Sequence, residues 1–575
     1  MEGIFLKKNI WKKLGITLMV GGILASTAGC SSDSSGSAKE KNSDPNALTI
    51  FSESSTYEGK VGGYVGKAIK EATGVSLSVV PNTVGGTSRL ETRLTTGDLG
   101  DLMVFTNSDD FNKAIKAGVV ADISKDMKDM KNINRFTDAV NRMEKEYDGK
   151  LYGIPTTVSA DAEVTRTNPQ NIPAMRYDYY KELGSPQVKN YWDYLDLAEQ
   201  MMKTHPKTDK GDKMYGISLF SEWDGKSINL LRGLANNFGY TDRDGLNTYN
   251  FLEVGVKDDS MKDILAENSI YMQGLSWLND AHRRGILDPD SASQTWEDYL
   301  KKAEKGQSAL LMWGYMGELN YNPTNPNMTA QSKGYKMVPN DTMVAVDAKT
   351  STIGNNWFWA ISSKSKKKEK ALKFLDYMYS DEGAMMYENG PQGVLWDLNK
   401  EGKPELTELG QNFGSSDTKA SKDVGGGAIA DTFKKLVNGP TIDQNAINPL
   451  YEEPSLRTIW TSYLKESATP LDKEWTADYG GALNAKEYLV EKGQSVSYPV
   501  VDVPTWKYDD DLEVVVNQVG DVIKEYSWKM IYANDEATFN SLKKEMLEKT
   551  TNLGYKKCVD FETKQAKVWT DARGQ

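Results

Sequence analysis

Cysteine and histidine are almost absent from this chain of 575 residues. Cys30 and Cys558 are its two cysteines, and His205 and His282 are its two histidines. Two cysteines exclude a disulfide framework and a cysteine-rich metal site. Two histidines leave little room for the imidazole ligands and bases on which zinc centres and many hydrolases depend. Catalysis built on these side chains is therefore disfavoured.

Positive charge is also in short supply. Lysine and arginine number 69 against 81 aspartate and glutamate residues, which gives a net charge of −12. Sequence-independent nucleic-acid binding needs a cationic surface that displaces counterions, so we expect no nucleic-acid partner. Hydrophobic residues make up 39% and charged residues 26%, the balance of a soluble globular protein. The length favours two or more lobes over a single core.

Aromatic side chains are what the chain has in excess, with 14 tryptophans and 29 tyrosines. A surplus of this kind favours recognition of a flat and partly apolar ligand. Most of these rings are nevertheless expected to lie in the core.

The first 47 residues carry an export signal. Positively charged lysines precede an apolar stretch at 14–28, which is too short and too glycine-broken for a membrane span. Small residues then lead to Cys30, which resembles a bacterial lipobox, although Thr27 stands where leucine is usual. We expect a signal peptide at 1–29, lipidation of Cys30 and a flexible tether at 30–47. Cleavage would remove four lysines and one glutamate and take the net charge from −12 to −15. The alternative is ordinary signal-peptidase cleavage with an incidental cysteine.

Strand and helix patterns alternate directly after this region. The apolar runs predict three strands, and amphipathic stretches between them predict helices, one ended by Gly74 and one capped by Asp109. Such a β-α-β-α-β order implies an open parallel sheet with its ligand in the loops beyond the strand ends, here 52–57 and 106–110. The strands are expected at 48–51, 75–79 and 102–105, and the helices at 61–72, 89–94 and 109–117.

The rest of the chain predicts a second α/β lobe with additional helices. An amphipathic helix at 365–379 follows it, and two helical patterns end the chain. The helices are expected at 191–202, 270–284, 514–531 and 535–550, and an apolar strand at 309–313.

Several phrases, in order, carry a resemblance to a known family. They resemble the extracellular solute-binding proteins of ABC sugar importers, in the larger Gram-positive lipoprotein branch. The match extends over roughly residues 48–400. The phrases are GDLGD (97–101), DGKLYGIP (148–155), RYDY (176–179), GILDP (285–289), WFWAIS (357–362) and SDEG (380–383).

The resemblance implies a two-lobed, periplasmic-binding-protein-like α/β fold of type II. Each lobe would be a sheet flanked by helices, with a hinge that the chain crosses more than once, near 155–156 and near 351–354. It also implies a monomeric protein, lipid-anchored on the extracellular face of the cell membrane, that closes on an oligosaccharide and delivers it to the membrane permease of an ABC importer. The expected first-lobe segments are 48–156 and 351–400, and the second-lobe segments are 157–350 and, in the main, 401–575.

No cofactor is expected, although calcium stays open. Asp242, Asp244 and Glu253 have the spacing of an EF-type loop, but Leu246 and Asn247 disrupt it. Some relatives carry a calcium loop where this chain has 207–213, with lysines in place of ligands. The glycine-rich stretch 59–67 departs from the Walker pattern, so nucleotide binding is not expected.

Two rival functions remain. A secreted glycosidase would need two carboxylates set about 5–9 Å apart, and no spacing here fixes such a pair. A peptide- or pheromone-binding lipoprotein would share the fold, the tether and an aromatic pocket. We predict a binding protein without enzyme activity.

Aromatic rings in loops beside glycine, aspartate or asparagine are the best candidates for a sugar site. A sugar presents an apolar C–H face to such a ring and hydroxyls to amides and carboxylates. For each tryptophan the alternative is core packing, which is the expectation for Trp192, Trp277 and Trp528. The predicted ligand-binding residues are Trp223, Trp313, Trp357 and Trp396, with Glu53, Asn107, Asp224 and Asn356 as polar partners.

Overall fold

The computed structural model describes residues 44–84, 87–413, 415 and 417–574. One compact unit comprises Asn46–Gln575. The predicted signal peptide, Cys30 and the tether as far as residue 43 lie outside the described residues. Within the described part, no helix has both the length and the apolar character needed to cross a bilayer.

The first lobe is built on a six-stranded sheet in the order β2-β3-β1-β6-β16-β7. β1 pairs in parallel with β3 and with β6, as the alternating pattern predicts. β16 comes from far along the chain and runs antiparallel to both β6 and β7. The strands are β1 (Ala47–Ser52), β2 (Gly59–Lys60), β3 (Ser76–Pro81), β6 (Leu102–Phe105), β7 (Gly153–Pro155) and β16 (Phe358–Ile361).

Helices pack against this sheet and fix the position of its loops. α1 (Gly63–Thr73) ends at Gly74, whose left-handed φ of 76° is readily adopted by glycine. α3 (Ser108–Lys116) begins earlier than predicted, because its N-cap is Asn107 and not Asp109. The Asn107 side-chain oxygen accepts a hydrogen bond from the Asp110 backbone N–H at 2.8 Å. α4 is Thr137–Glu146, α12 is Lys368–Met378 and α13 is Asp381–Asn389.

The second lobe has a four-stranded sheet in the order β14-β8-β13-β9. β13 is parallel to β9, whereas β8 is antiparallel to both of its neighbours. The strands are β8 (Ala174–Arg176), β9 (Tyr215–Ile217), β13 (Ser308–Leu311) and β14 (Tyr335–Met337).

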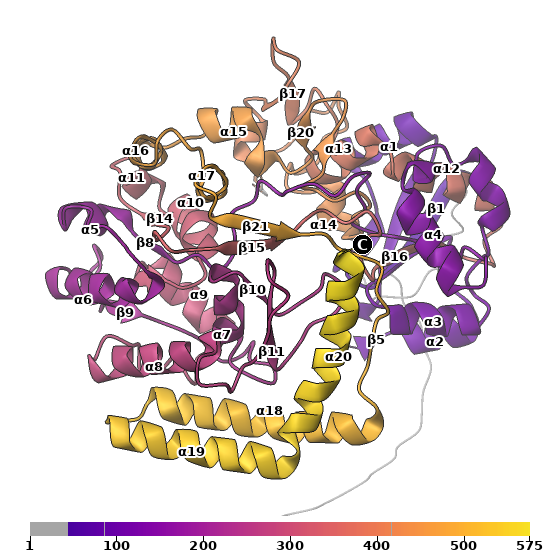
Figure 1. The fold of residues 1–575 in the computed structure, drawn as a ribbon. Coiled ribbons are helices and arrows are strands. Elements are labelled where there is room, and N and C mark those ends of the chain that lie inside the picture. The colour runs from indigo at the N-terminus through magenta and orange to yellow at the C-terminus, as the bar shows by residue number, and fades with distance from the viewer. Residues whose placement is uncertain (1–43, 85–86, 414, 416, 575) are drawn as a thin grey trace, which may run out of the picture. The chain divides into compact units, whose positions relative to one another are not determined.

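Long helices cover this lobe, and the last of them was not predicted from the sequence. The C-terminal helix α18 packs on both α8 and α19, and α20 follows as a third helix (Figure 1). The expected helices near 270–284, 514–531 and 535–550 are all present. The principal helices are α6 (Tyr194–Thr204), α7 (Asn229–Leu234), α8 (Ile270–Arg283), α9 (Trp296–Glu304), α18 (Asp510–Ile531), α19 (Glu536–Leu553) and α20 (Tyr555–Arg573).

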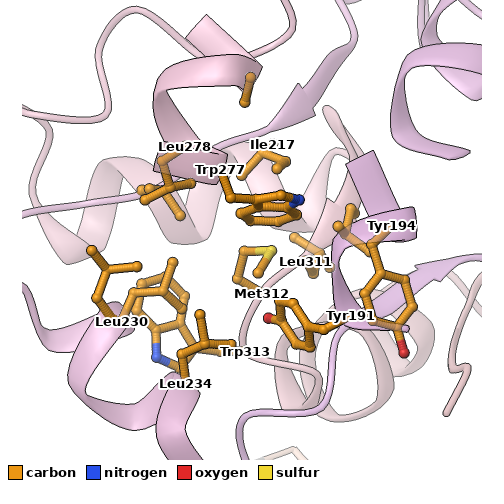
Figure 2. Packing of buried hydrophobic residues seen from close by; sticks show 14 of the residues in the cluster. Tyr191, Tyr194, Ile217, Leu230, Leu234, Trp277, Leu278, Leu311, Met312 and Trp313 are labelled. Atoms are coloured by element: carbon orange, nitrogen blue, oxygen red, sulfur yellow. The ribbon is translucent and has the colours of Figure 1, made fainter. Parts of the chain in front are cut away.

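Each sheet has its own hydrophobic core. The first core contains the strands of the six-stranded sheet together with α12 side chains such as Phe374. The second core contains Trp277, which confirms its core prediction, whereas Trp192 and Trp528 are partly buried and pack against this core. Figure 2 shows Trp277 and Met312 in this core, with Trp313 beside Leu230 and Leu234.

Three chain segments run side by side where the chain passes between the two cores. The Thr156 N–H donates to the Trp357 carbonyl at 2.9 Å, and the Val158 N–H donates to the Thr441 carbonyl at 3.0 Å. The Ser159 N–H donates to the Ser351 carbonyl at 2.8 Å. We call residues 155–159, 350–357 and 441–443 the crossing segments. The third of these was not predicted.

The part of the chain after residue 400 divides between the cores. Phe433 and Val437 pack in the first core, whereas Leu471 and Trp475 pack in the second, along with residues of the three C-terminal helices. The bounds of the lobes stay a prediction, and the first lobe draws on more of 401–575 than was expected.

Candidate ligand-binding site

The strand register brings predicted site residues together at one edge of the first sheet. Ser52 pairs with Val104, and Phe358 pairs with both Phe105 and Pro155. The residues that follow β1, β6 and β7, and the residue that precedes the antiparallel β16, therefore reach the same edge of the sheet. These residues are Glu53, Thr106, Trp357 and Thr156.

Glu53 has one oxygen bound and one free. Its Oε2 accepts hydrogen bonds from the Thr106 backbone N–H at 2.7 Å and from the Thr106 hydroxyl at 3.0 Å. Its Oε1 is buried and has no hydrogen-bond partner among the described residues. Burial, with a smaller contribution from the charge of Asp110, raises the pKa of Glu53. A buried acceptor without a donor is costly, so this oxygen is suited to a donor supplied by a ligand.

Asn107 lies beside this edge but is occupied by its capping role. In addition to the capping bond, its side-chain N–H donates to Asp110 Oδ2 at 3.0 Å. Asp110 in turn binds Lys113 Nζ at 2.7 Å, and this ion pair lowers the pKa of the Asp110 carboxyl despite the opposing effect of partial burial. Asn107 thus holds the loop after β6 in place.

The segment that leads into Trp357 is held by a buried arginine. Arg142, on α4, donates from Nη1 to the carbonyls of Ile353 and Asn355 and from Nη2 to the Asn356 side-chain oxygen at 2.6 Å. Burial lowers the pKa of Arg142. Trp357 itself is half-buried, and its backbone is fixed by Asn355 and Thr156. Asn356 therefore positions this segment, and the Trp357 ring follows it at the sheet edge.

The corresponding edge of the second sheet carries a group of aromatic rings. β9 and β13 are parallel, so Trp223 and Trp313 both follow strands that end at the same edge. Trp223 is 45% exposed and stacks on Trp296, with ring centroids 4.4 Å apart and an interplanar angle of 22°. Trp313 is 5% exposed and lies against Phe220 and Tyr299. Trp223 is the exposed ring of the group, Trp296 beside it is partly buried, and Trp313 lies in the core, with Phe220 in contact with all three rings.

Two other predicted residues are engaged within the protein. Asp224 accepts hydrogen bonds from the Asn229 N–H and, at 2.8 Å, from the Trp528 indole N–H, and burial raises its pKa to about 6. Trp396, in β17 (Trp396–Leu398), is 2% exposed and packs with Trp460. Its indole N–H donates to the Gly390 carbonyl at 2.9 Å. The structure thus places Trp313 and Trp396 in hydrophobic clusters and gives Asp224 a structural role.

Several residues of these edges were missed by the sequence reasoning. The sequence analysis identified the loop that contains Thr106 and the crossing that contains Thr156. It did not select their side chains, because a threonine in a loop is not distinctive of a ligand site. Trp296 is the first residue of α9, and Arg142 lies within α4. Neither has the turn-like context by which the other aromatic and polar candidates were chosen.

The acidic residues with EF-type spacing bind protein donors. Asp242 is paired with Arg232 at 2.9 Å and with Arg243 at 3.2 Å. Glu253 accepts from the N–H groups of Ile270 and Tyr271 at the start of α8, and burial raises its pKa to about 7. Within the described residues, no group of three or more His, Cys, Asp or Glu side chains is placed to hold a metal ion.

Two hollows lie elsewhere in the described part of the chain. One, of about 90 Å³, adjoins the crossing segments and is lined in part by the Arg135–Asp381 ion pair. Ligand pockets usually measure about 300–1,000 Å³, so this cavity is too small for an oligosaccharide. The other is open and lined by α19 residues alone, so it is the surface of one helix.

Two ion pairs connect first-lobe helices to the segment 499–509 of the second lobe. Lys507 Nζ lies 2.6 Å from Asp109 Oδ1, at the start of α3, and both side chains are exposed. Lys145, on α4, binds Asp502 at 3.0 Å. The first pair lies two residues from Asn107, and therefore next to the edge that carries Glu53.

Comparison with known proteins agrees with this architecture. Residues 56–385 match the family model described as bacterial extracellular solute-binding protein. Lipoprotein LipO of Bacillus subtilis (strain 168) is 23% identical over 359 residues, which are 58% of this chain and 64% of LipO, just under two thirds of its length. The fructooligosaccharide ABC transporter substrate-binding protein FusA of Streptococcus pneumoniae is 20% identical over 468 residues, 79% of this chain and 78% of FusA.

Solved structures show the same fold. FusA in complex with kestose has a TM-score of 0.52 at 16% identity, covering 91% of this chain and 99% of that one. A human-milk-oligosaccharide (HMO) binding solute-binding protein from Bifidobacterium longum infantis has a TM-score of 0.51 at 14% identity, with the same coverage. The predicted two-lobed α/β fold of type II is therefore confirmed.

Proposed function

We propose that this chain, which belongs to the family of bacterial extracellular solute-binding proteins, captures an oligosaccharide outside the cell and delivers it to an ABC importer. Proteins of this family serve transport and are not enzymes. FusA and the Bifidobacterium protein are named for oligosaccharides, which supports the same ligand class here. We further propose that the protein is a monomer and that a lipid on Cys30 anchors it to the outer face of the membrane.

One observation carries the proposal of a sugar ligand. The buried Glu53 Oε1 has no donor among the residues that the structure describes, and it lies on the sheet edge that also carries Trp357. A sugar can bind both groups, because its hydroxyls can donate a hydrogen bond to the Glu53 oxygen and its C–H face can stack on the Trp357 ring. The exposed Trp223 ring, stacked on Trp296, supplies a second stacking surface on the other lobe. Asn107, Asp224 and Asn356 would position these groups.

The ligand test is a thermal-shift screen followed by calorimetry. Fructooligosaccharides, milk oligosaccharides, N-glycan fragments and a peptide pool are compared, since a ligand stabilises the folded state by RT ln(1 + [L]/Kd). We expect at least one oligosaccharide to raise the melting temperature and to be recovered uncut. Stabilisation by peptides alone would favour the peptide-binding rival, and turnover of the glycan would favour the glycosidase.

Glu53 provides the matched variant for this screen. Glu53→Gln keeps the size of the side chain but replaces a charged acceptor, so affinity for the identified oligosaccharide should fall at least tenfold, which corresponds to about 1.4 kcal/mol. Glu91→Gln, at an exposed position of α2 (Leu90–Thr96), is the control and should bind as the wild type does. Equal affinities of the two variants would remove Glu53 from the site.

The anchor is tested separately from the ligand. Cys30→Ala should abolish incorporation of a fatty-acid probe while export continues, because the thiol is the proposed acylation site. Equal labelling of the variant and the wild type would show that Cys30 is not lipidated.

A further inference from the structure

A cluster of lysines stands out on the first lobe of this acidic chain. Residues 364–373, at the start of α12, contain six lysines and one glutamate, whereas the whole chain has a net charge of −12. Lys364, Lys366 and Lys373 are exposed, and none of the three makes an ion pair within the described part of the chain.

The cluster adjoins the first residues of the compact unit. Lys367 Nζ donates to the Ala47 carbonyl, and Lys370 Nζ donates to the Asn46 side-chain oxygen at 2.6 Å. Ala47 is the first residue of β1. Two lysines of the cluster therefore contact the point at which the chain enters the first sheet.

A short helical segment extends the cluster. Lys368 Nζ binds Asp126 Oδ2 at 2.6 Å, in the 3-10 helix η1 (Ser124–Asp129). This contact places η1, which carries the exposed Lys125 and Lys128, beside the start of α12. We define the lysine patch as the lysines of residues 122–131 and 364–376, namely Lys125, Lys128, Lys131, Lys364, Lys366, Lys367, Lys368, Lys370 and Lys373.

Acidic side chains within the same segments reduce the charge of the lysine patch but do not cancel it. Nine lysines face five carboxylates, which leaves a net charge of +4. Asp126 is paired with Lys368, and Asp376 accepts hydrogen bonds from Asn132 and Ile133. The remaining carboxylates are Asp122, Asp129 and Glu369.

The lysine patch and the candidate ligand site lie at opposite ends of the same strand. Ala47 begins β1, and Glu53 directly follows its last residue. A six-residue strand spans about 20 Å, at roughly 3.3 Å per residue. A surface that the lysine patch rests on would therefore leave the edge with Glu53 and Trp357 on the side away from it.

We propose that the lysine patch binds anionic phospholipid headgroups of the membrane to which the protein is anchored. This inference rests on the proposed lipid anchor and not on the identity of the glycan. An acyl chain and a basic patch acting together hold a protein on a membrane more firmly than either alone. Before delivery to the permease, the patch would orient the anchored protein so that its ligand site faces outward, towards the incoming solute.

The test uses residues 31–575, which contain the whole compact unit but no acylated cysteine. Vesicles of phosphatidylcholine, with or without phosphatidylglycerol, are floated with the protein at several salt concentrations. Each lysine near an anionic surface contributes about fivefold in binding at low salt, and this effect is screened as ionic strength rises. We expect binding to vesicles with phosphatidylglycerol only, and loss of that binding at high salt.

Matched variants identify the surface responsible. Lys364→Gln/Lys366→Gln/Lys373→Gln should bind at least tenfold more weakly than the wild type. The control Lys544→Gln/Lys557→Gln/Lys564→Gln removes the same charge from exposed positions on α19 and α20 and should bind as the wild type does. Melting temperature and glycan affinity, measured on the same samples, should be unchanged in both variants.

Two results would overturn the proposal. One is equal binding, or no binding, of the wild type to vesicles with and without phosphatidylglycerol. The other is an equal loss in the control variant, which would attribute binding to net charge and not to the lysine patch. Neither result affects the glycan screen, so a failure here is separate from a failure of the proposed function.

Discussion

Replacing Trp223 with alanine separates ligand contact from core packing, with Trp313→Ala as the comparison. A fully buried aromatic side chain removes about 200 Å² from water, which at about 25 cal/mol per Å² corresponds to roughly 5 kcal/mol. Trp313 is 5% exposed and should lose close to this amount on truncation, whereas Trp223 is 45% exposed and should lose about half of it. The two variants thus differ by roughly 2 kcal/mol in the free energy of unfolding.

Binding should follow the opposite order. Trp223→Ala removes the exposed face of the Trp223–Trp296 stack and should weaken oligosaccharide affinity at least tenfold, or about 1.4 kcal/mol. Trp313 lies beneath this surface, so Trp313→Ala should bind with nearly wild-type affinity wherever it is folded. Chemical denaturation measures the free energy of unfolding, and titration calorimetry measures the oligosaccharide affinity. Trp223→Phe, which retains an aromatic face, is the control and should keep most of the affinity.

One result would refute the assignment of Trp223 to the ligand site. If Trp223→Ala binds as the wild type does and its free energy of unfolding falls as far as that of Trp313→Ala, the ring is a packing element. The site would then have to lie away from the aromatic group of the second lobe.

Two further predictions concern stability and closure. Glu562, on α20, is buried and accepts hydrogen bonds from the N–H groups of residues 250 and 251, and burial raises its pKa to about 7. The unfolded pKa of this carboxyl is near 4.5, and below that pH its contribution to stability is fully present. This contribution is lost as pH rises through the folded pKa of about 7. The free energy of unfolding should therefore fall by up to about 3 kcal/mol between these two values. Glu253 has a similarly raised pKa and adds its own contribution, so denaturation of Glu562→Gln should show a smaller slope than the wild type. An unchanged slope would assign the effect to other groups. Lys507→Ala breaks the exposed ion pair with Asp109. Its glycan affinity should fall less than about fivefold at low salt and should equal that of the wild type at high salt, because salt screens exposed ion pairs. A loss that does not depend on salt would place Lys507 in direct contact with the ligand.

The sequence was informative about the first edge because strand ends are local features. Glu53 and Trp357 were chosen for their positions in loops next to apolar runs, and the register of β1, β6 and β16 then brings them to one edge. The parallel order of β1, β3 and β6 follows from the same local alternation.

The burial of individual tryptophans could not be predicted in the same way. Trp396 is covered by Trp460, and Trp313 by Phe220 and Tyr299, partners that are distant in sequence. Whether a ring is covered depends on such partners and not on its neighbours in the chain. Trp296 was missed because it is the first residue of a helix, a position that suggested core packing. Its ring nevertheless stacks on the exposed Trp223.

The connections between the sheets join the two edges that carry the proposed ligand-binding residues. The chain leaves the first sheet at the carboxyl end of β7 and enters the second at the start of β8, which is antiparallel to β13 and so begins at the edge where β13 ends. It returns from the end of β14 to the start of β16, again joining the same two edges. Small backbone rotations in the crossing segments would therefore change the separation of Glu53 and Trp357 from the Trp223–Trp296 pair while each sheet stays rigid. In this arrangement the residues proposed to bind the ligand lie beside the crossing segments, where closure would take place, so ligand contacts to both lobes would favour a closed form without a separate relay.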